Sequence, residues 1–214
     1  MRKFGVEIEC DHYLGDSGYA GWPSHFKHCG TEFVSPILQG EDGLRDVRDF
    51  FKAVRPIVSD SCGLHVHVDV RDFTGEEKLE LVKRLKSEKE IFFSKVDKKR
   101  HNNLYCSKDI PAPYRNDDWY SYKTRVSTDR FCWVNLNAIR DHGSVEFRLH
   151  EATENVGKVC AWVRFLTEFV ESVKTGCSVS ECPACVDKQF INSQVDMLVS
   201  GGWSDCTFQR AGLR

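Results

Sequence analysis

The sequence of 214 residues predicts an α+β protein in which helices pack on one face of an antiparallel sheet. Several short segments alternate apolar and ionisable residues, as a strand does when only one of its faces meets the core. Longer segments carry apolar residues at helical spacing. Such helices need an apolar sheet face to cover, which leaves the opposite face of the sheet free to be polar.

The expected strands alternate along their length and end at turn residues. Pro36 ends the second strand, and the last two form a hairpin around Asp141, His142 and Gly143. The five segments are "KFGVEIEC" at 3–10, "TEFVSPIL" at 31–38, the histidine-bearing stretch within 59–70, "RFCWVNLNAI" at 130–139 and "SVEFRLHEA" at 144–152.

Three helices are expected between and after these strands. The first lies within 43–57 and repeats apolar residues at helical spacing. Thr74 and Glu77 form a capping-box pattern that opens a second helix running to residue 96. The third has an apolar stripe within 154–176 and stops near Gly176. Residues 99–130 are expected to be irregular, basic and aromatic.

Composition excludes several classes of protein. Hydrophobic residues make up 41% and charged residues 29%, the balance of a globular chain, and the formal charge of −2 gives no general attraction to nucleic acid or anionic membranes. No apolar run is long enough to span a membrane. With no apolar signal segment at the N-terminus, we expect a cytoplasmic protein whose ten cysteines are reduced thiols or metal ligands.

Two parts are expected: a catalytic domain over 1–175 and a short cysteine-bearing segment over 176–214. Cys182 and Cys185 form a C-x-x-C motif, with Cys177 and Cys206 nearby. Free thiols on a packed tail are favoured over a structural zinc site, because the second pair lacks zinc-ribbon spacing.

Ionisable residues of the predicted strands gather on one face. Positions two apart in a strand share a face, so this polar face should carry Glu7, Glu9, Glu32, His65, His67, Glu146 and Arg148. An ordinary solvated face would avoid such like-charged neighbours. Clustered carboxylates raise one another's pKa unless a cation lies among them. A carboxylate-rich set with imidazole suits Mg²⁺ or Mn²⁺, whereas Zn²⁺ prefers more nitrogen or sulfur.

Four motifs occur in an order that resembles a known family. "FGVEIE", "TEFVSPIL", "GLHVHVDV" and "SVEFRLHEAT" are similar to those of the amidoligase family, and "RHNNLYC" and "RFCWVNLNAI" look like its middle region. This family belongs with the carboxylate–amine ligases of the glutamine synthetase and γ-glutamylcysteine ligase type. The resemblance covers residues 3–172.

The resemblance implies a curved antiparallel sheet of the glutamine synthetase catalytic-domain type, which encloses ATP and two or three divalent cations, Mg²⁺ or Mn²⁺. Glu9 and Glu32 would hold one cation. A second would be held by Glu7, His65 and Glu146. His67 is similar to a histidine that contacts ATP phosphates, and Arg148 to an arginine that stabilises the transferred phosphoryl group. Arg125 and Arg130 would be further phosphate contacts, and Arg130 would also have a catalytic role.

The sequence departs from the family pattern before the second strand. "HFKHCG" at 25–30 stands where the family usually has an acidic turn. A further glutamate, which binds the first cation in the larger ligases, has no counterpart that we can locate. The number of cations therefore stays open.

The expected function is that of an ATP- and Mg²⁺-dependent ligase that joins a small-molecule or peptide carboxylate to an amine through an acyl phosphate. Phosphoryl transfer of this kind is assisted by cations and by a guanidinium on the transferred group. Two alternatives stay open. A guanidino-kinase-like phosphotransferase would stop at the phosphorylated product, and a metal-stabilised binding module would lack turnover.

Overall fold

The computed structural model describes residues 1–19, 21–27, 30–125 and 131–176. Met1–Gly176 form one compact unit. The predicted tail, with Cys177, Cys182, Cys185 and Cys206, lies outside the described residues, so its boundary and its state of metal binding stay predictions.

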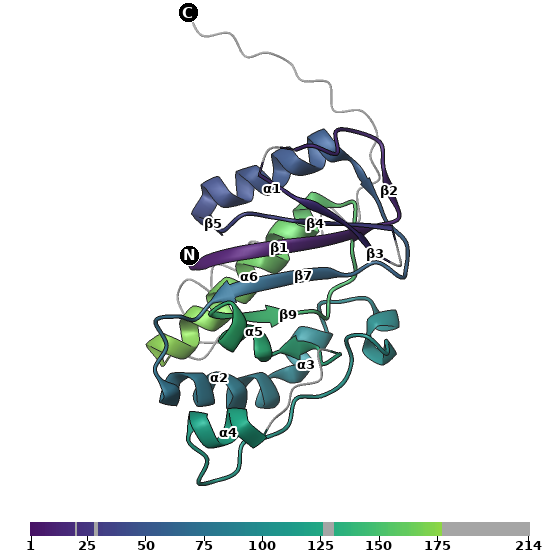
Figure 1. The fold of residues 1–214 in the computed structure, drawn as a ribbon. Helices are drawn as coiled ribbons and strands as arrows, with labels where there is room; N and C mark the ends of the chain where they lie inside the picture. Colours follow the sequence, from purple (N-terminus) through teal and green to yellow (C-terminus); the bar gives the residue numbers. More distant parts are fainter. Residues whose placement is uncertain (20, 28–29, 126–130, 177–214) are drawn as a thin grey trace, which may run out of the picture. The chain divides into compact units, whose positions relative to one another are not determined.

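A seven-stranded sheet forms the centre of this unit (Figure 1). Its hydrogen-bonded order is β3-β4-β1-β7-β9-β8, β5 also pairs with β1, and every strand pair is antiparallel. The strands are β1 (Lys3–Cys10), β3 (Ser24–Lys27), β4 (Gly30–Val34), β5 (Leu38–Gln39), β7 (Leu64–Asp69), β8 (Val134–Asn135) and β9 (Ser144–Phe147). The short strands β2 (His12–Tyr13) and β6 (Pro56–Ile57) pair separately.

The expected alternation is present in the long strands. Phe4, Val6 and Ile8 of β1 are buried, while Glu7 and Glu9 between them are only partly covered. In β7 and β9 the apolar residues are likewise fully buried: Leu64, Val66, Val68, Val145 and Phe147. One face of the sheet therefore belongs to the core, as the sequence predicts.

The described residues form six α-helices, which confirms the predicted α+β class. They are α1 (Gly40–Val54), α2 (Gly75–Ser87), α3 (Lys89–Phe93), α4 (Trp119–Arg125), α5 (Asn137–Asp141) and α6 (Val156–Thr175), and a 3₁₀ turn spans Lys98–Asn102. In Figure 1, α6 crosses behind β1 and β7, with α1 beside it. The apolar sides of these two helices cover the apolar face of the sheet.

The predicted helix over 74–96 is two helices. It opens with the expected capping box: the Thr74 hydroxyl accepts from the Glu77 backbone, and the Glu77 carboxylate accepts from the Thr74 backbone. The helix breaks at Glu88, and α3 follows. Phe92 of α3 is fully buried and stacks on Phe147 with ring centroids 5.9 Å apart, so tertiary packing overrides the continuous helical pattern.

Two further expectations are corrected. The strand predicted over 130–139 is confined to Val134–Asn135, and α5 stands where the second half of that strand was expected, ending at Asp141 of the predicted turn. The Asn135 side chain accepts from the Asn137 backbone and so starts this helical turn. Gly143, with a φ of 69°, still returns the chain to β9, so the antiparallel β8–β9 pair is present. Residues 99–130, expected to be irregular, include α4.

Candidate active site

The polar face of the sheet brings the predicted ionisable residues into register. Glu7 pairs with His65 across β1 and β7, Glu9 with Glu32 across β1 and β4, and His67 with Glu146 across β7 and β9. Because β1 lies between β4 and β7, its two glutamates reach side chains on both neighbours. Glu32, His65 and Glu146 are each at most 6% exposed.

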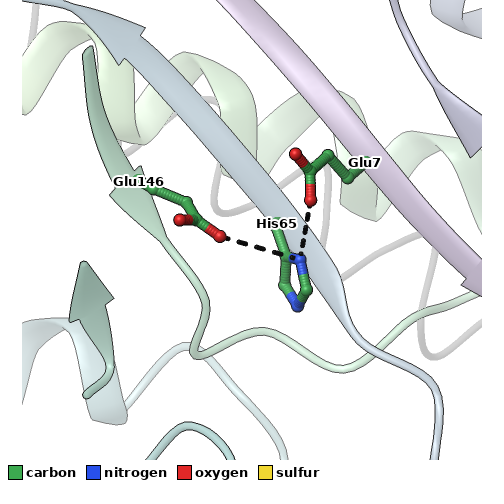
Figure 2. Close-up of side chains that lie close together, drawn as sticks. All are labelled: Glu7, His65 and Glu146. Atoms are coloured by element: carbon green, nitrogen blue, oxygen red, sulfur yellow. Dashed lines mark hydrogen bonds and ion pairs between the residues drawn. The ribbon is translucent and has the colours of Figure 1, made fainter. Parts of the chain in front are cut away.

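Glu7, His65 and Glu146 form the first of two candidate ligand sets (Figure 2). One ligand atom from each lies within 4.8 Å of the other two. His65 Nδ1 lies 3.1 Å from a Glu7 oxygen and 3.8 Å from a Glu146 oxygen. Figure 2 shows the two carboxylates approaching this ring nitrogen from neighbouring strands on either side.

Glu9, Glu32 and His65 form the second set, with ligand atoms also within 4.8 Å of one another. The Gly63 backbone N–H donates to Glu9 Oε2 at 2.6 Å. Lys27 Nζ lies 2.9 Å from Glu32 Oε2 and donates to it, which raises the pKa of this lysine. The two sets match the two groups that the family resemblance implies, and they share the imidazole of His65.

His67 and Glu7 share a hydrogen bond that shifts the pKa of both groups. His67 Nε2 lies 3.1 Å from Glu7 Oε1, and its Nδ1 lies 2.9 Å from the Ser144 hydroxyl. Burial opposes the ionisation of Glu7, but hydrogen bonds and charge from the two histidines outweigh it and hold the pKa of this carboxyl well below its usual range. Burial lowers the pKa of His67, and the bond with Glu7 and the charge of Glu146 outweigh that effect and raise it.

Arg148 adjoins the first set. Its Nη1 donates to Glu146 Oε1. Its side chain is 17% exposed, and its buried Nε has no hydrogen-bond partner in the described part of the chain. The other oxygen of Glu146 accepts from the Asn135 side chain at 2.6 Å. Glu146 is therefore fixed from both sides, and Arg148 also lines the cavity next to this set.

Arg125, another predicted phosphate contact, is not brought to this cluster. Arg125 pairs with Asp117, and its guanidinium carbon lies 3.8 Å from the centroid of the Tyr114 ring. These contacts hold it beside the loop that precedes α4. Arg130 lies outside the described residues. Their predicted roles stay predictions.

Sequence reasoning missed several residues around the cluster. Asn135 and Ser144 are ordinary polar strand residues, and only the pairing with β7 and β9 reveals their partners. Lys27 lies on β3, whose four residues are all exposed and show no alternation. Arg100 is only 4% exposed and donates to the carbonyl oxygens of Leu149 and Arg148. The spacing of the histidines in the sequence did not point to any of these four residues.

Two cavities meet at Glu7. The larger, of about 510 Å³, is lined by the second ligand set, by Glu7 of the first, and by Lys27, Arg100, Tyr105, Cys106 and Arg148. The smaller, of about 360 Å³, runs from Glu7 and His67 past Gly5 to the apolar residues Val34, Pro36 and Ile37. Its rim carries Lys3, Arg71 and His142.

The donor set fits a hard divalent cation. Four carboxylates share this face with three cationic side chains, Lys27, Arg100 and Arg148. The depressed pKa of Glu7 keeps that ligand ionised. Carboxylate oxygens with one imidazole suit Mg²⁺ or Mn²⁺, and no cysteine belongs to either set among the described residues.

The fold and this cluster define an α+β protein with a carboxylate- and histidine-rich centre on one sheet face. Comparison with protein families identifies the chain more closely: residues 11–170 match the model of a family described as "putative amidoligase enzyme". The chain belongs to this family, whose name indicates an enzyme that forms amide bonds. No curated protein matches the sequence at the threshold applied. No helix within the described residues is long and apolar enough to cross a membrane.

Proposed function

We propose that this protein is an ATP- and Mg²⁺-dependent carboxylate–amine ligase, which forms an amide or peptide bond through an acyl phosphate. One observation carries the proposal: four carboxylates and the imidazole of His65 meet on the polar face of the sheet as two sets whose ligand atoms lie within 4.8 Å of one another, and His67 adjoins them through Glu7. Family membership supports the amide-bond chemistry. The Mg²⁺ and ATP dependence rest on the donor set and on the cavities around it.

The cation would be held by Glu7, His65 and Glu146, with Glu9 and Glu32 alongside. Bound there, a divalent cation would offset the charge of nucleotide phosphate oxygens and of the transferred group. Asn135 and Arg148 hold the two oxygens of Glu146 and so orient this ligand.

Arg148 and His67 would bind the phosphate groups. Arg148 lines the larger cavity beside the first ligand set, where a guanidinium can stabilise charge on the transferred phosphoryl group. His67 is held between Glu7 and Ser144, and its raised pKa favours the protonated, phosphate-binding form. It faces the smaller cavity.

The two cavities suggest where the substrates bind. The smaller one begins at His67 and ends at apolar walls, which suits a nucleoside whose phosphates point back to Glu7. The larger one contains Arg100, Arg148 and Lys27, which suit the carboxylate substrate. The reacting groups would then meet where the cavities join.

In the proposed reaction, a carboxylate oxygen of the acid attacks the γ-phosphorus of ATP, and ADP leaves with the bond electrons. The amine nitrogen then attacks the acyl carbon, inorganic phosphate leaves, and the amine gives up a proton. The product is lighter by one water than the acid and the amine together. Arg148 acts in the first step, and the acidic face near Glu9 and Glu32 would hold the amine in its approach.

The test is a mass-spectrometric search with ADP and phosphate assays. The protein is incubated with ATP, Mg²⁺, pooled amino acids and γ-glutamyl compounds. Ligase activity predicts a product lighter by one water and equal amounts of ADP and phosphate, each requiring acid and amine. A phosphorylated product without free phosphate would instead identify a phosphotransferase, and no ADP at all would identify a binding module.

Matched variants tie the activity to this site. Glu7→Gln should abolish product formation, whereas Glu41→Gln, on α1, should leave it unchanged because Glu41 only pairs with Arg164 on α6. Equal activity in both variants would place the reaction elsewhere.

Two finer points belong to the same proposal. The order in which β1, β4, β7 and β9 present the ligand sets supports a sheet of the glutamine synthetase catalytic-domain type. A cytoplasmic location is supported by the cysteines of the described residues, which are buried and form no disulfide with one another: Cys10, Cys62, Cys106, Cys132 and Cys160.

A further inference from the structure

Lys27 places a positive charge on the second ligand set. It ends β3, which pairs with β4 so that His25 lies opposite Glu32. Its Nζ donates to Glu32 Oε2 at 2.9 Å, while the Glu32 side chain is 8% exposed. An ammonium group therefore already neutralises one of the two carboxylates that would hold a second cation.

His65 cannot serve two cations at once. Its Nδ1 faces Glu7 and Glu146. Its Nε2 faces the other set: a β-carbon at Gly63 would lie 2.9 Å from this nitrogen and 3.2 Å from Glu9 Oε2. A neutral imidazole has one lone pair for a metal, and its other nitrogen carries a proton. If Nδ1 is the ligand, the N–H at Nε2 points toward the second set.

The oxygens of the second set are further occupied by protein donors. Glu9 Oε2 accepts from the Gly63 backbone at 2.6 Å, and Glu32 Oε2 accepts from Lys27. With His65 Nδ1 bound to the first cation, the second set is left with two carboxylates and with an ammonium and an N–H donor among them, whereas the first set keeps three ligand side chains. A hard cation is correspondingly less favoured there.

We propose that the protein itself binds one divalent cation, at Glu7, His65 and Glu146, and that the Lys27 ammonium takes the place of a second cation between Glu9 and Glu32. This inference rests on the proposed function for the first cation. A further cation would enter only with the nucleotide phosphates. Lys27 is thus a residue that determines metal stoichiometry.

The experiment counts Mn²⁺ ions bound without nucleotide, by calorimetry and by electron paramagnetic resonance. The wild-type protein should bind one ion. Lys27→Met should bind a second ion, with an affinity at least about tenfold above that of the same position in the wild type. The variant removes a unit positive charge about 4 Å from that partly buried position. Lys27→Arg should keep the stoichiometry of one.

Lys52→Met is the matched control. Lys52 also donates to a carboxylate, Asp49, at 2.9 Å, but on the exposed surface of α1. This variant should bind one ion. A thermal melt adds a second readout: without metal, Lys27→Met should melt lower than the wild type, because Glu9 and Glu32 then repel each other. Mn²⁺ should raise the melting temperature of Lys27→Met by more than it raises that of the wild type.

The outcomes separate this inference from the proposed function. Two ions in the wild type, one of them lost in Glu32→Gln, would overturn the role of Lys27 and leave the ligase proposal standing. One ion in Lys27→Met would also overturn it. A wild type that binds no Mn²⁺ would remove the cation site itself and with it both proposals.

Discussion

Glu7 is the single residue on which most of the site converges. Its two oxygens contact two different histidines, His65 and His67, at 3.1 Å each. It lines both cavities. A carboxylate held in this way stays ionised at low pH and is ready to bind a cation.

Replacing the carboxylates of the first set should weaken cation binding. Glu7→Gln and Glu146→Gln each remove a charge from a ligand of a hard cation. Mn²⁺ affinity should therefore fall at least about tenfold, since losing a residue that only hydrogen-bonds to a metal ligand typically costs that much. Calorimetry with Mn²⁺ measures this, and Glu41→Gln serves as the control. Unchanged affinity in both variants would place the cation elsewhere.

Arg148 should act on the chemical step more than on binding. A guanidinium presents a planar fork to phosphate oxygens, whereas lysine offers a point charge. Arg148→Lys should therefore lower kcat by about 10³-fold with little change in KM for ATP, the pattern of an interaction made in the transition state. The pairing with Glu146 should survive the change, so the fold is retained.

The steady-state kinetics of Arg148→Lys is measured alongside that of Arg140→Lys, which serves as the control. Arg140 is exposed and pairs only with its neighbour Asp141 among the described residues, so its variant should match the wild type. A raised KM for ATP with unchanged kcat in Arg148→Lys would assign this arginine to ground-state binding instead.

At the scale of elements, β1 combines charged residues with one residue that lacks a side chain. Gly5, Glu7 and Glu9 share the polar face, and Gly5 lies opposite His67. Its φ is not in the left-handed region, and a β-carbon there would meet only His67 and Ser35 atoms at 3.8 Å. The glycine is therefore not needed by the backbone, but it leaves the floor of the smaller cavity open.

Filling this position should block the cavity without unfolding the strand. Gly5→Val should raise KM for ATP by about tenfold or more, since its branched side chain enters the space assigned to the nucleoside. Gly5→Ala should change it little. The melting temperature should stay equal or rise in both, because glycine weakens a strand interior. An unchanged KM in Gly5→Val would move the nucleoside out of this cavity.

The same scale shows why part of the fold could be predicted. In β1, β7 and β9 the alternation is local and complete, so the sequence alone assigns Glu7, His65 and Glu146 to one face. The elements that were missed have no such pattern. All residues of β3 are exposed, and α4 depends on contacts such as the Tyr122 hydroxyl donating to the Pro111 carbonyl. Those contacts are not encoded in periodicity.

At the scale of the whole molecule, the strand order assembles the site from distant segments. β1 pairs with β7, and β7 with β9, so ligands more than 130 residues apart along the chain meet at His65. The predicted motifs were in the right order, but which glutamate reaches which histidine follows from the register. Lys27 and Asn135 join the site only through strand pairing, which explains why the sequence did not reveal them.

An ion-pair network ties the two ends of the unit together. Arg2, just before β1, donates to Asp72 at 2.7 Å and pairs with Glu171 of α6 at the same distance. Lys174 of α6 lies 2.8 Å from Asp72. The hydrogen bond from Arg2 holds the pKa of the Asp72 carboxyl well below its usual range, with Lys174 adding to this against partial burial.

This network should make stability depend on pH in a defined direction. Because the pKa of Asp72 is lower in the folded state than in the unfolded state, its contribution to stability is complete above the unfolded pKa of about 3.9. That contribution is lost as the pH falls toward the folded pKa. Asp72→Asn should therefore lower the free energy of unfolding by about 1 kcal/mol at pH 7 and by less at pH 3, as measured by urea denaturation. Asp49→Asn breaks a pair within α1 and should cost at most about 0.5 kcal/mol. Equal losses for Asp72→Asn at both pH values would show that its charge does not hold β1 to α6.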